Sequence, residues 1–172
     1  MKKIFLLRLS LYLPLVLLVN LPAKSQDEKL KAIFVYNFTK YVNWPQRSGN
    51  FVITVIGKSP ISAEIISIAS KKTVGSSTIE VKVVNSPEEV TESQIVYIPA
   101  SKNNALAVIK EKSPERHFLI ITEKPEACKA GSCINFVNRD GRLSFEISKI
   151  NLEIYGLGVS SDLLKLGTVV TN

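Results

Sequence analysis

Few residues in this chain could do chemistry. The only histidine, His117, stands just before the apolar run Phe118–Ile121, which is typical of a residue at the end of a strand. The acidic pairs Asp27-Glu28 and Glu88-Glu89 come at expected helix starts, where negative charge favours the helix dipole. An enzyme needs a nucleophile, a base and a stabilising group within reach of one another. Because we find no such set, the sequence predicts a non-catalytic protein.

Cofactor and metal motifs give the same answer. No Gly-x-Ser-x-Gly sequence precedes an expected helix, and no phosphate-binding Gly-x-x-x-x-Gly-Lys-Ser/Thr occurs. Gly156-Leu-Gly158 lacks the third glycine of a dinucleotide-binding loop. No histidine lies near the two cysteines, so a zinc site is not expected. We therefore expect neither a cofactor nor a metal.

The two cysteines, Cys128 and Cys133, flank the short segment Lys129-Ala-Gly-Ser132. In an oxidising compartment, such a pair can form a disulfide that closes a tight loop. A redox-active pair is the alternative, but the spacing is not Cys-x-x-Cys and no thiol-activating base stands beside it. We expect a structural disulfide, which in so short a loop contributes about 2 kcal/mol.

Residues 1–25 have the pattern of an export signal. A basic start is followed by a mostly apolar run from Leu9 to Leu21, and Ala23-Lys24-Ser25 offers small residues for cleavage before Gln26. The apolar run is shorter than the roughly 20 residues of a membrane-spanning helix. We expect a cleaved signal peptide and an exported, soluble mature domain over residues 26–172. An uncleaved N-terminal anchor is the alternative.

The basic charge of the chain comes mostly from this signal. The full sequence has 22 basic and 15 acidic residues, a net charge of +7. Four of the basic residues lie within residues 1–25, which leaves 18 against 15 and a net charge of +3. Lysines and glutamates alternate through the mature chain without a basic run. Nucleic-acid binding, which relies on clustered Lys and Arg, is therefore not expected.

The mature chain opens on an unusually aromatic segment that must be held by some element. Its apolar residues have helical spacing, which predicts a helix from Asp27 to Asn43. The stripe expected to face the core consists of Leu30, Ile33, Phe34, Phe38 and Tyr41. Val35, Tyr36 and Val42 lie off that stripe, and apolar residues on a second side of a surface helix need another cover. We hypothesise a partner or dimer surface formed by Tyr36, Val42 and Trp44.

Short apolar strands alternate with helices through the middle of the chain. The expected strands are Phe51–Ile56, Thr78–Val84, Gln94–Ile98 and His117–Thr122. Helices are expected to begin at Pro60 and Asn103. Such alternation predicts a parallel sheet with covering helices.

The C-terminal part follows a different pattern. Ile134–Val137 and Leu143–Ile147 flank Asn138-Arg-Asp-Gly141, which predicts a β-hairpin. Ile150, Leu152 and Ile154 alternate as in a strand, but the pattern leaves open whether the tail from Ile150 is helix or strand. Ser161–Leu166 reads as a capped helix. The fold class is therefore a single α/β domain, with a mainly parallel sheet flanked by helices and a C-terminal β-hairpin and helix.

With these elements in place, the chain resembles the YfiR family of exported bacterial proteins. The matching segments are Lys31-Ala-Ile-Phe-Val-Tyr-Asn-Phe-Thr-Lys-Tyr-Val-Asn-Trp-Pro45, Phe51–Gly57, Gln94–Ile98, Gly131–Phe136, Leu143–Ile147 and Leu157–Leu166. The resemblance implies a periplasmic, commonly dimeric α/β domain without catalytic activity. It also implies that the protein restrains a membrane-bound diguanylate cyclase through that enzyme's periplasmic region, lowering cyclic-di-GMP signalling and biofilm formation.

The resemblance also bears on individual residues. Cys128 and Cys133 match a disulfide of the family, whereas Ser93 stands where members often carry a cysteine. The tail departs from the family, because the family is helical from about Asn151 while this sequence alternates.

Two functions remain as hypotheses. The first is a regulator that binds a membrane signalling protein, with a homodimer expected. The second is a small-ligand-binding domain that uses the carboxyl ends of its parallel strands, where open α/β sheets tend to bind ligands. In that case Gly57, Asn85, Pro99 and Thr122 would line the site.

Overall fold

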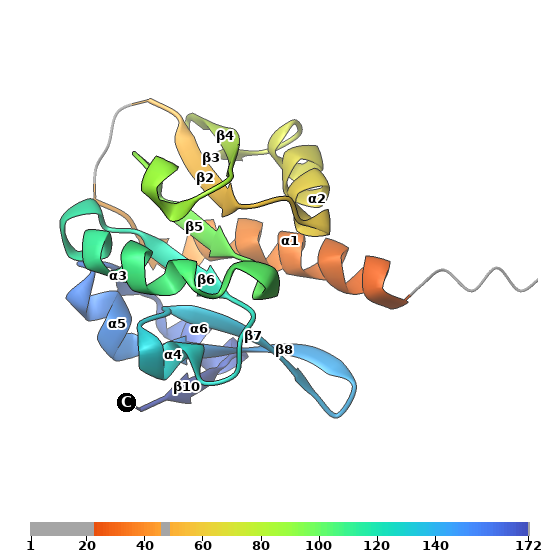
Figure 1. The fold of residues 1–172 in the computed structure, drawn as a ribbon, viewed down its shortest axis with the longest axis vertical. Coiled ribbons are helices and arrows are strands. Elements are labelled where there is room, and N and C mark those ends of the chain that lie inside the picture. Colours follow the sequence, from red (N-terminus) through yellow and green to blue (C-terminus); the bar gives the residue numbers. More distant parts are fainter. Residues whose placement is uncertain (1–22, 46–48, 172) are drawn as a thin grey trace, which may run out of the picture.

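In the computed structural model, which describes residues 23–45 and 49–171, an eight-stranded sheet runs through the centre of the domain (Figure 1). In spatial order its strands are β10 (Thr168–Val170), β8 (Arg142–Ser148), β7 (Ile134–Arg139), β6 (Leu119–Thr122), β5 (Ile95–Ile98), β2 (Phe51–Ile56), β4 (Ser77–Val84) and β3 (Thr73–Val74). The five strands from β4 to β7 are parallel, whereas β8 is antiparallel to β7 and β3 is antiparallel to β4. The predicted mainly parallel sheet is confirmed.

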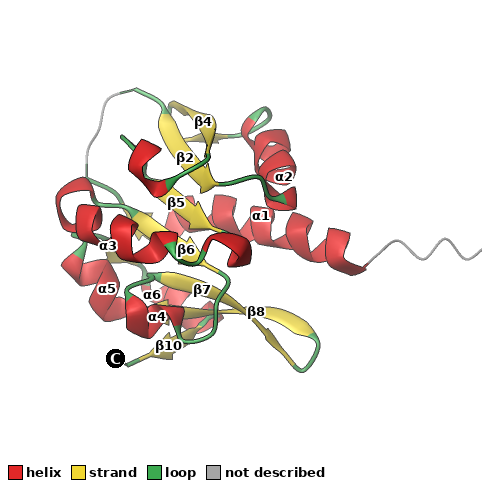
Figure 2. Ribbon diagram, in the orientation of Figure 1, coloured by secondary structure: helices red, strands yellow, loops and turns green. Residues whose placement is uncertain are grey.

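Helices cover both faces of this sheet. One face carries α1 (Ala23–Tyr41), α2 (Pro60–Ala69) and α6 (Ser161–Leu166), and the other carries α3 (Ala105–Arg116), α4 (Ala127–Ala130) and α5 (Lys149–Ile154), as Figures 1 and 2 show. Every residue of β2, β5 and β6 is buried. This double cover explains why these strands read as continuous apolar runs rather than as alternating ones.

The predicted hairpin forms as β7 and β8. Its turn residues Asp140 and Gly141 have φ angles of 52° and 76°. Two consecutive left-handed residues suit the right-handed twist of the flanking strands, and Asp-Gly is a favoured pair for such a turn. The hairpin brings Phe136 and Phe145 opposite each other, and both are buried.

The alternation in the tail, which left helix or strand open from Ile150, does not mark a strand, because the residues from Lys149 to Ile154 form the helix α5. The hydroxyl of Ser148 accepts a hydrogen bond from the backbone N–H of Asn151 and caps the helix at its first turn. Leu152 is buried, whereas Ile150 and Ile154 are exposed one helical turn apart. The period of two therefore reflected two exposed residues flanking a buried one. The departure from the resemblance that the alternation indicated at this point is therefore absent.

Three smaller features complete the domain. The predicted helix α6 is confirmed, and the Ser160 hydroxyl caps it. β1 (Val42–Asn43) pairs with β9 (Gly158–Val159) in a second, two-stranded sheet that ties the end of α1 to the C-terminal region. The predicted signal peptide lies mostly in residues 1–22, outside the described residues, and α1 already includes the predicted cleavage point. Across the described part of the chain, none of the helices has the length and apolarity needed to cross a membrane.

Candidate partner and ligand sites

The buried side of α1 differs from the predicted stripe. Val35 is fully buried and Val42 is 4% exposed, whereas Leu30 and Ile33 are 41% and 40% exposed. The helix carries apolar residues on more than one side, so helical spacing alone could not tell which of these sides faces the core. Val42 belongs to the core and is not available as a partner surface. Leu30 and Ile33, which the predicted stripe places in the core, are instead the large apolar residues that α1 exposes.

An aromatic cluster fixes α1 against the hairpin. The ring of Phe38 meets that of Phe145 edge-on at 5.2 Å, and Phe34 contacts the same ring at 5.4 Å. Phe136 lies 6.1 Å from Phe38 and 6.4 Å from Tyr97. Such contacts add to the free energy gained by burying the rings. Phe34 and Phe38, two of the five aromatic residues in the opening segment, therefore hold α1 against the sheet.

The two remaining residues of the predicted partner surface are only half-buried. The Tyr36 hydroxyl donates a hydrogen bond to the Thr73 carbonyl at 3.4 Å, and the Lys40 ammonium lies 4.6 Å from the centre of the Tyr36 ring. The Trp44 indole donates to the Thr39 carbonyl at 3.1 Å, and its ring packs edge-on against Phe51. Both side chains have contacts within the domain and still present part of their surface.

A charged cluster joins α1 to the carboxyl ends of β5 and β6. The Lys31 ammonium lies 3.0 Å from a Glu28 carboxylate oxygen and 2.8 Å from one of Glu123. The Tyr97 hydroxyl donates a short hydrogen bond to the other Glu123 oxygen. The three charged side chains are only 11% to 16% exposed. The second oxygen of Glu28 is buried without a hydrogen-bond partner among the described residues.

The surroundings shift the titration of two members of this cluster. Burial disfavours the Lys31 ammonium, but its hydrogen bonds and charge attraction to Glu123 and Glu28 outweigh this, so the pKa of Lys31 is raised. Burial, with the neighbouring Glu123 charge, raises the pKa of Tyr97 well above its ordinary value. The cluster therefore keeps a charged lysine and a neutral tyrosine at pH 7. Sequence reasoning missed it, since Lys31 and Glu123 are 92 positions apart.

The predicted disulfide is not formed, because Cys128 and Cys133 are free, buried thiols. The loop between them is held by other bonds. The side-chain amide nitrogen of Asn151 donates to the carbonyls of Cys128 and Ser132 at 2.6 and 2.8 Å. The Tyr155 hydroxyl donates to the Gly131 carbonyl at 2.7 Å. Burial raises the pKa of Cys128 to about 12 and raises that of Cys133 as well. Thiols that stay neutral at pH 7 are poor nucleophiles, which also disfavours a redox-active pair.

The expected ligand residues do not form one open site at the carboxyl edge of the sheet. A side chain added at Gly57 would meet the stem of Lys102 at 2.6 Å, so Lys102 covers this position. The Lys102 ammonium reaches the Asn85 carbonyl at 3.5 Å. Pro99 is buried, and the Thr122 hydroxyl is occupied by Ser132 and Asn135, both at 2.9 Å. The structure brings Gly57 and Asn85 together around Lys102 and places Thr122 in a separate hydrogen-bonded network.

His117 has a structural position. It ends α3 in the left-handed conformation, with φ of 56°, and its Nδ1 donates to the Tyr155 carbonyl at 2.8 Å. It thereby links the C-terminal ends of α3 and α5. In the described part of the chain, no group of three or more His, Cys, Asp or Glu side chains could hold a metal ion.

Comparison with known proteins gives one assignment. A search of curated proteins found no match. A family model described as YfiR/HmsC-like matches residues 28–168, from within α1 to the first residue of β10. This span includes the charged cluster, the aromatic cluster and both cysteines. The chain therefore belongs to the YfiR/HmsC-like family.

Proposed function

We propose that this protein is an exported, non-catalytic regulator that binds the outer region of a membrane-bound diguanylate cyclase and restrains it. The observation that carries the proposal is the family match over residues 28–168. In such a mechanism, the regulator binds one conformation of the outer region more tightly than the other. Binding then shifts the population of the enzyme toward its inactive state, by as much as the two affinities differ.

The exposed side of α1 is the surface that we assign to the partner. Leu30 and Ile33 lie three positions apart and are therefore neighbours on the helix surface. Both are about 40% exposed, although they are large apolar residues. Tyr36 continues the same side of the helix and is half-buried. Contact with a partner, or with a second copy in the expected homodimer, would remove this apolar surface from water.

The test measures cyclic-di-GMP in cells that lack the protein and in cells that express it again. Loss of the protein should raise cyclic-di-GMP, and re-expression should lower it. The variant Leu30→Glu/Ile33→Glu should be exported and folded but fail to lower cyclic-di-GMP, because two carboxylates would oppose burial of this surface. Ile66→Glu is the matched control, since Ile66 is 49% exposed on another helix, α2. Unchanged cyclic-di-GMP on loss of the protein would refute the proposal.

Two further measurements test the expected setting of this function. Cell fractionation should place the mature protein in the periplasm, with its N-terminus at Gln26. Sedimentation of the purified protein should show a dimer, and Leu30→Glu/Ile33→Glu would turn it into a monomer if the partner surface is also the dimer surface.

A further inference from the structure

The two halves of α1 are attached to the domain in different ways. The C-terminal half is held by apolar packing, since Val35 is fully buried and Phe38 lies in the aromatic cluster. Among residues 25–33, by contrast, only Glu28 and Ala32 are buried. Figures 1 and 2 show the first turns of α1 projecting beyond the rest of the domain. Apolar burial therefore contributes much less to the docking of the N-terminal half than to that of the C-terminal half.

The charged cluster holds the N-terminal half instead. The Lys31 ammonium lies between Glu28 on the same helix and Glu123, which follows β6. The Tyr97 hydroxyl fixes Glu123 from β5. Within the described part of the chain, the contact of Lys31 with Glu123 is the only hydrogen bond or ion pair that joins residues 26–33 to another element. The docking of this segment therefore depends on one buried ion pair.

Three free-energy terms oppose this docking. The second carboxylate oxygen of Glu28 is buried without a hydrogen-bond partner among the described residues, which costs desolvation free energy. The loss of hydration by the buried charges offsets much of their mutual attraction. The docked segment also gives up backbone and side-chain conformational freedom. All three terms vanish when residues 26–33 leave the domain, because the charges return to water and the chain regains its freedom.

We propose that residues 26–33 form a releasable strap, which docks through the contact of Lys31 with Glu123 and detaches while the rest of the domain stays folded. The predicted mature chain begins at Gln26, so the strap is its first segment. Release breaks one ion pair and exposes the small side chain of Ala32. The aromatic cluster keeps the C-terminal half of α1 in place.

The strap carries Leu30 and Ile33, the exposed apolar residues of α1. Only a docked strap presents these two side chains on a helix beside Tyr36, so release takes the partner surface apart. A partner that binds only the docked form has an apparent affinity that falls in proportion to the docked fraction. The strap therefore sets how much of the protein is competent to bind. This regulatory part of the inference rests on the proposed function, whereas the release itself does not.

Amide hydrogen exchange of the purified mature protein, followed by NMR, measures the release. In the wild type, residues 28–33 should be less protected than residues 35–39, because the strap exchanges through a local opening. Lys31→Met should make the strap exchange about 100-fold faster, which is the scale of a buried pair that loses one partner. Equal protection along the whole of α1 would mean that the helix opens only when the domain unfolds, and would overturn the proposal.

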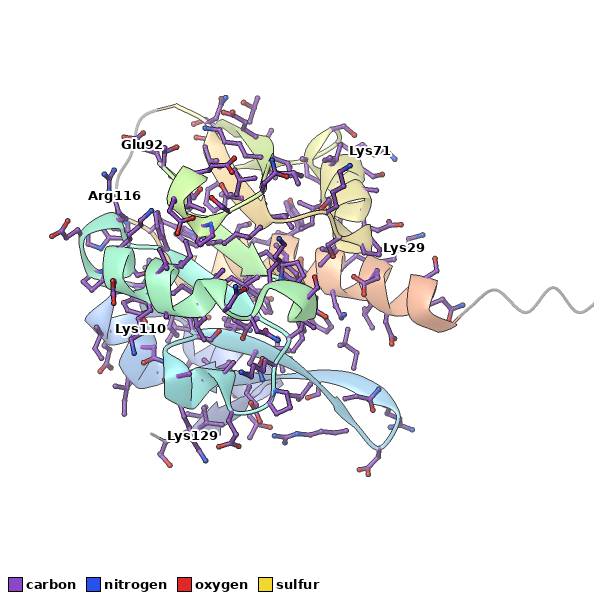
Figure 3. All side chains as sticks on the ribbon, viewed as in Figure 1. Lys29, Lys71, Glu92, Lys110, Arg116 and Lys129 are labelled. Carbon is purple, nitrogen blue, oxygen red and sulfur yellow. The ribbon has the colours of Figure 1, made fainter. Side chains whose placement is uncertain are left out.

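Glu123→Gln tests the same contact from the opposite side. Although this residue follows β6, its substitution should make residues 28–33 exchange about tenfold faster, since a charge-assisted hydrogen bond is lost while Lys31 keeps Glu28. Lys29→Met is the matched control, because Lys29 is exposed on the strap itself (Figure 3), and it should leave the exchange unchanged. If all three variants exchange like the wild type, ordinary fraying of a helix end explains the difference in protection and the proposal is overturned.

Cellular cyclic-di-GMP tests whether regulation needs the docked strap. Lys31→Met should be exported but lower cyclic-di-GMP less than the wild type does, whereas Lys71→Met, on the turn after α2, should act as the wild type (Figure 3). Adding Glu123→Gln to Lys31→Met should restore part of the effect, because removal of the second uncompensated charge lets the strap dock again. A lost direct contact between Lys31 and the partner would not be restored in this way.

The outcomes separate the strap from the proposed function. Full regulation by Lys31→Met, in a protein whose strap exchanges faster, would overturn the link between docking and regulation. A wild type that does not lower cyclic-di-GMP would refute the regulatory function and with it this link, while the exchange data still decide whether the strap is released.

Discussion

Replacing Lys31 with methionine should destabilise the protein through the charged cluster that joins α1 to the sheet. Methionine keeps much of the length of the lysine stem but removes the ammonium that lies 3.0 Å from Glu28 and 2.8 Å from Glu123. Two carboxylates that are 11% and 16% exposed would then remain without a cation. Breaking one partner out of a buried pair costs about 3 to 5 kcal/mol. Because some solvent reaches this cluster, we expect a loss of about 3 kcal/mol.

The assay is denaturant unfolding at pH 7, followed by circular dichroism. Lys29→Met is the matched control, because Lys29 is exposed on the same helix, and it should change the free energy of unfolding by no more than about 0.5 kcal/mol. Adding Glu123→Gln to Lys31→Met should recover about 1 to 2 kcal/mol, since one uncompensated charge is removed. If Lys31→Met costs no more than Lys29→Met, the cluster does not stabilise the fold and the reasoning is wrong.

Three further predictions concern the core. Phe38→Ala should lower the free energy of unfolding by about 3 to 5 kcal/mol, because it empties the centre of the aromatic cluster; equal stability in denaturant unfolding would contradict that role. Gly167→Ala should lower the free energy of unfolding by about 1 to 3 kcal/mol in the same assay, because the added Cβ would come within 2.5 Å of the Phe145 ring. Gly75→Ala is the control: the added Cβ there meets no other atom, and we expect a loss of only about 1 kcal/mol from the positive φ of Gly75. The buried thiols should make the reduced protein less stable in alkaline solution. Burial raises the pKa of both thiols in the folded protein above the unfolded value of 9.0. The stability that they contribute is therefore fully present below pH 9.0. Above this pH the unfolded thiols ionise, and the free energy of unfolding falls by about 1.4 kcal/mol per thiol for each pH unit, up to the folded pKa. Cys128→Ala/Cys133→Ala should lack this part of the pH dependence, and identical alkaline curves for the two proteins would show that the thiols do not titrate as buried groups.

Local patterns predicted the central part of the fold well. The runs Phe51–Ile56 and Gln94–Ile98 became β2 and β5, because β-branched residues covered on both faces leave little choice of structure. The Asp140-Gly141 turn likewise determined the hairpin. β3 and β10 were not predicted, since both are short edge strands whose only signal is the neighbour with which they pair.

Contacts between distant residues were the part that sequence patterns could not supply. Val42 was assigned to the surface and Leu30 to the core, because the sheet that chooses the buried side of α1 is formed by residues far along the chain. The pairing of Lys31 with Glu123 depends on the same long-range packing. The Cys128–Cys133 pair was predicted as a disulfide from its spacing, while the hydrogen bonds from Asn151 that hold this loop were not visible locally.

The most direct test of the regulatory role is the activity of a diguanylate cyclase with and without this protein. The mature protein would be used to isolate its membrane partner, and the partner would be reconstituted in vesicles with its outer region accessible. Adding the mature protein should lower the rate of cyclic-di-GMP synthesis, and Leu30→Glu/Ile33→Glu should not. If no diguanylate cyclase is recovered, or if the recovered enzyme works at the same rate with and without the protein, the account is contradicted.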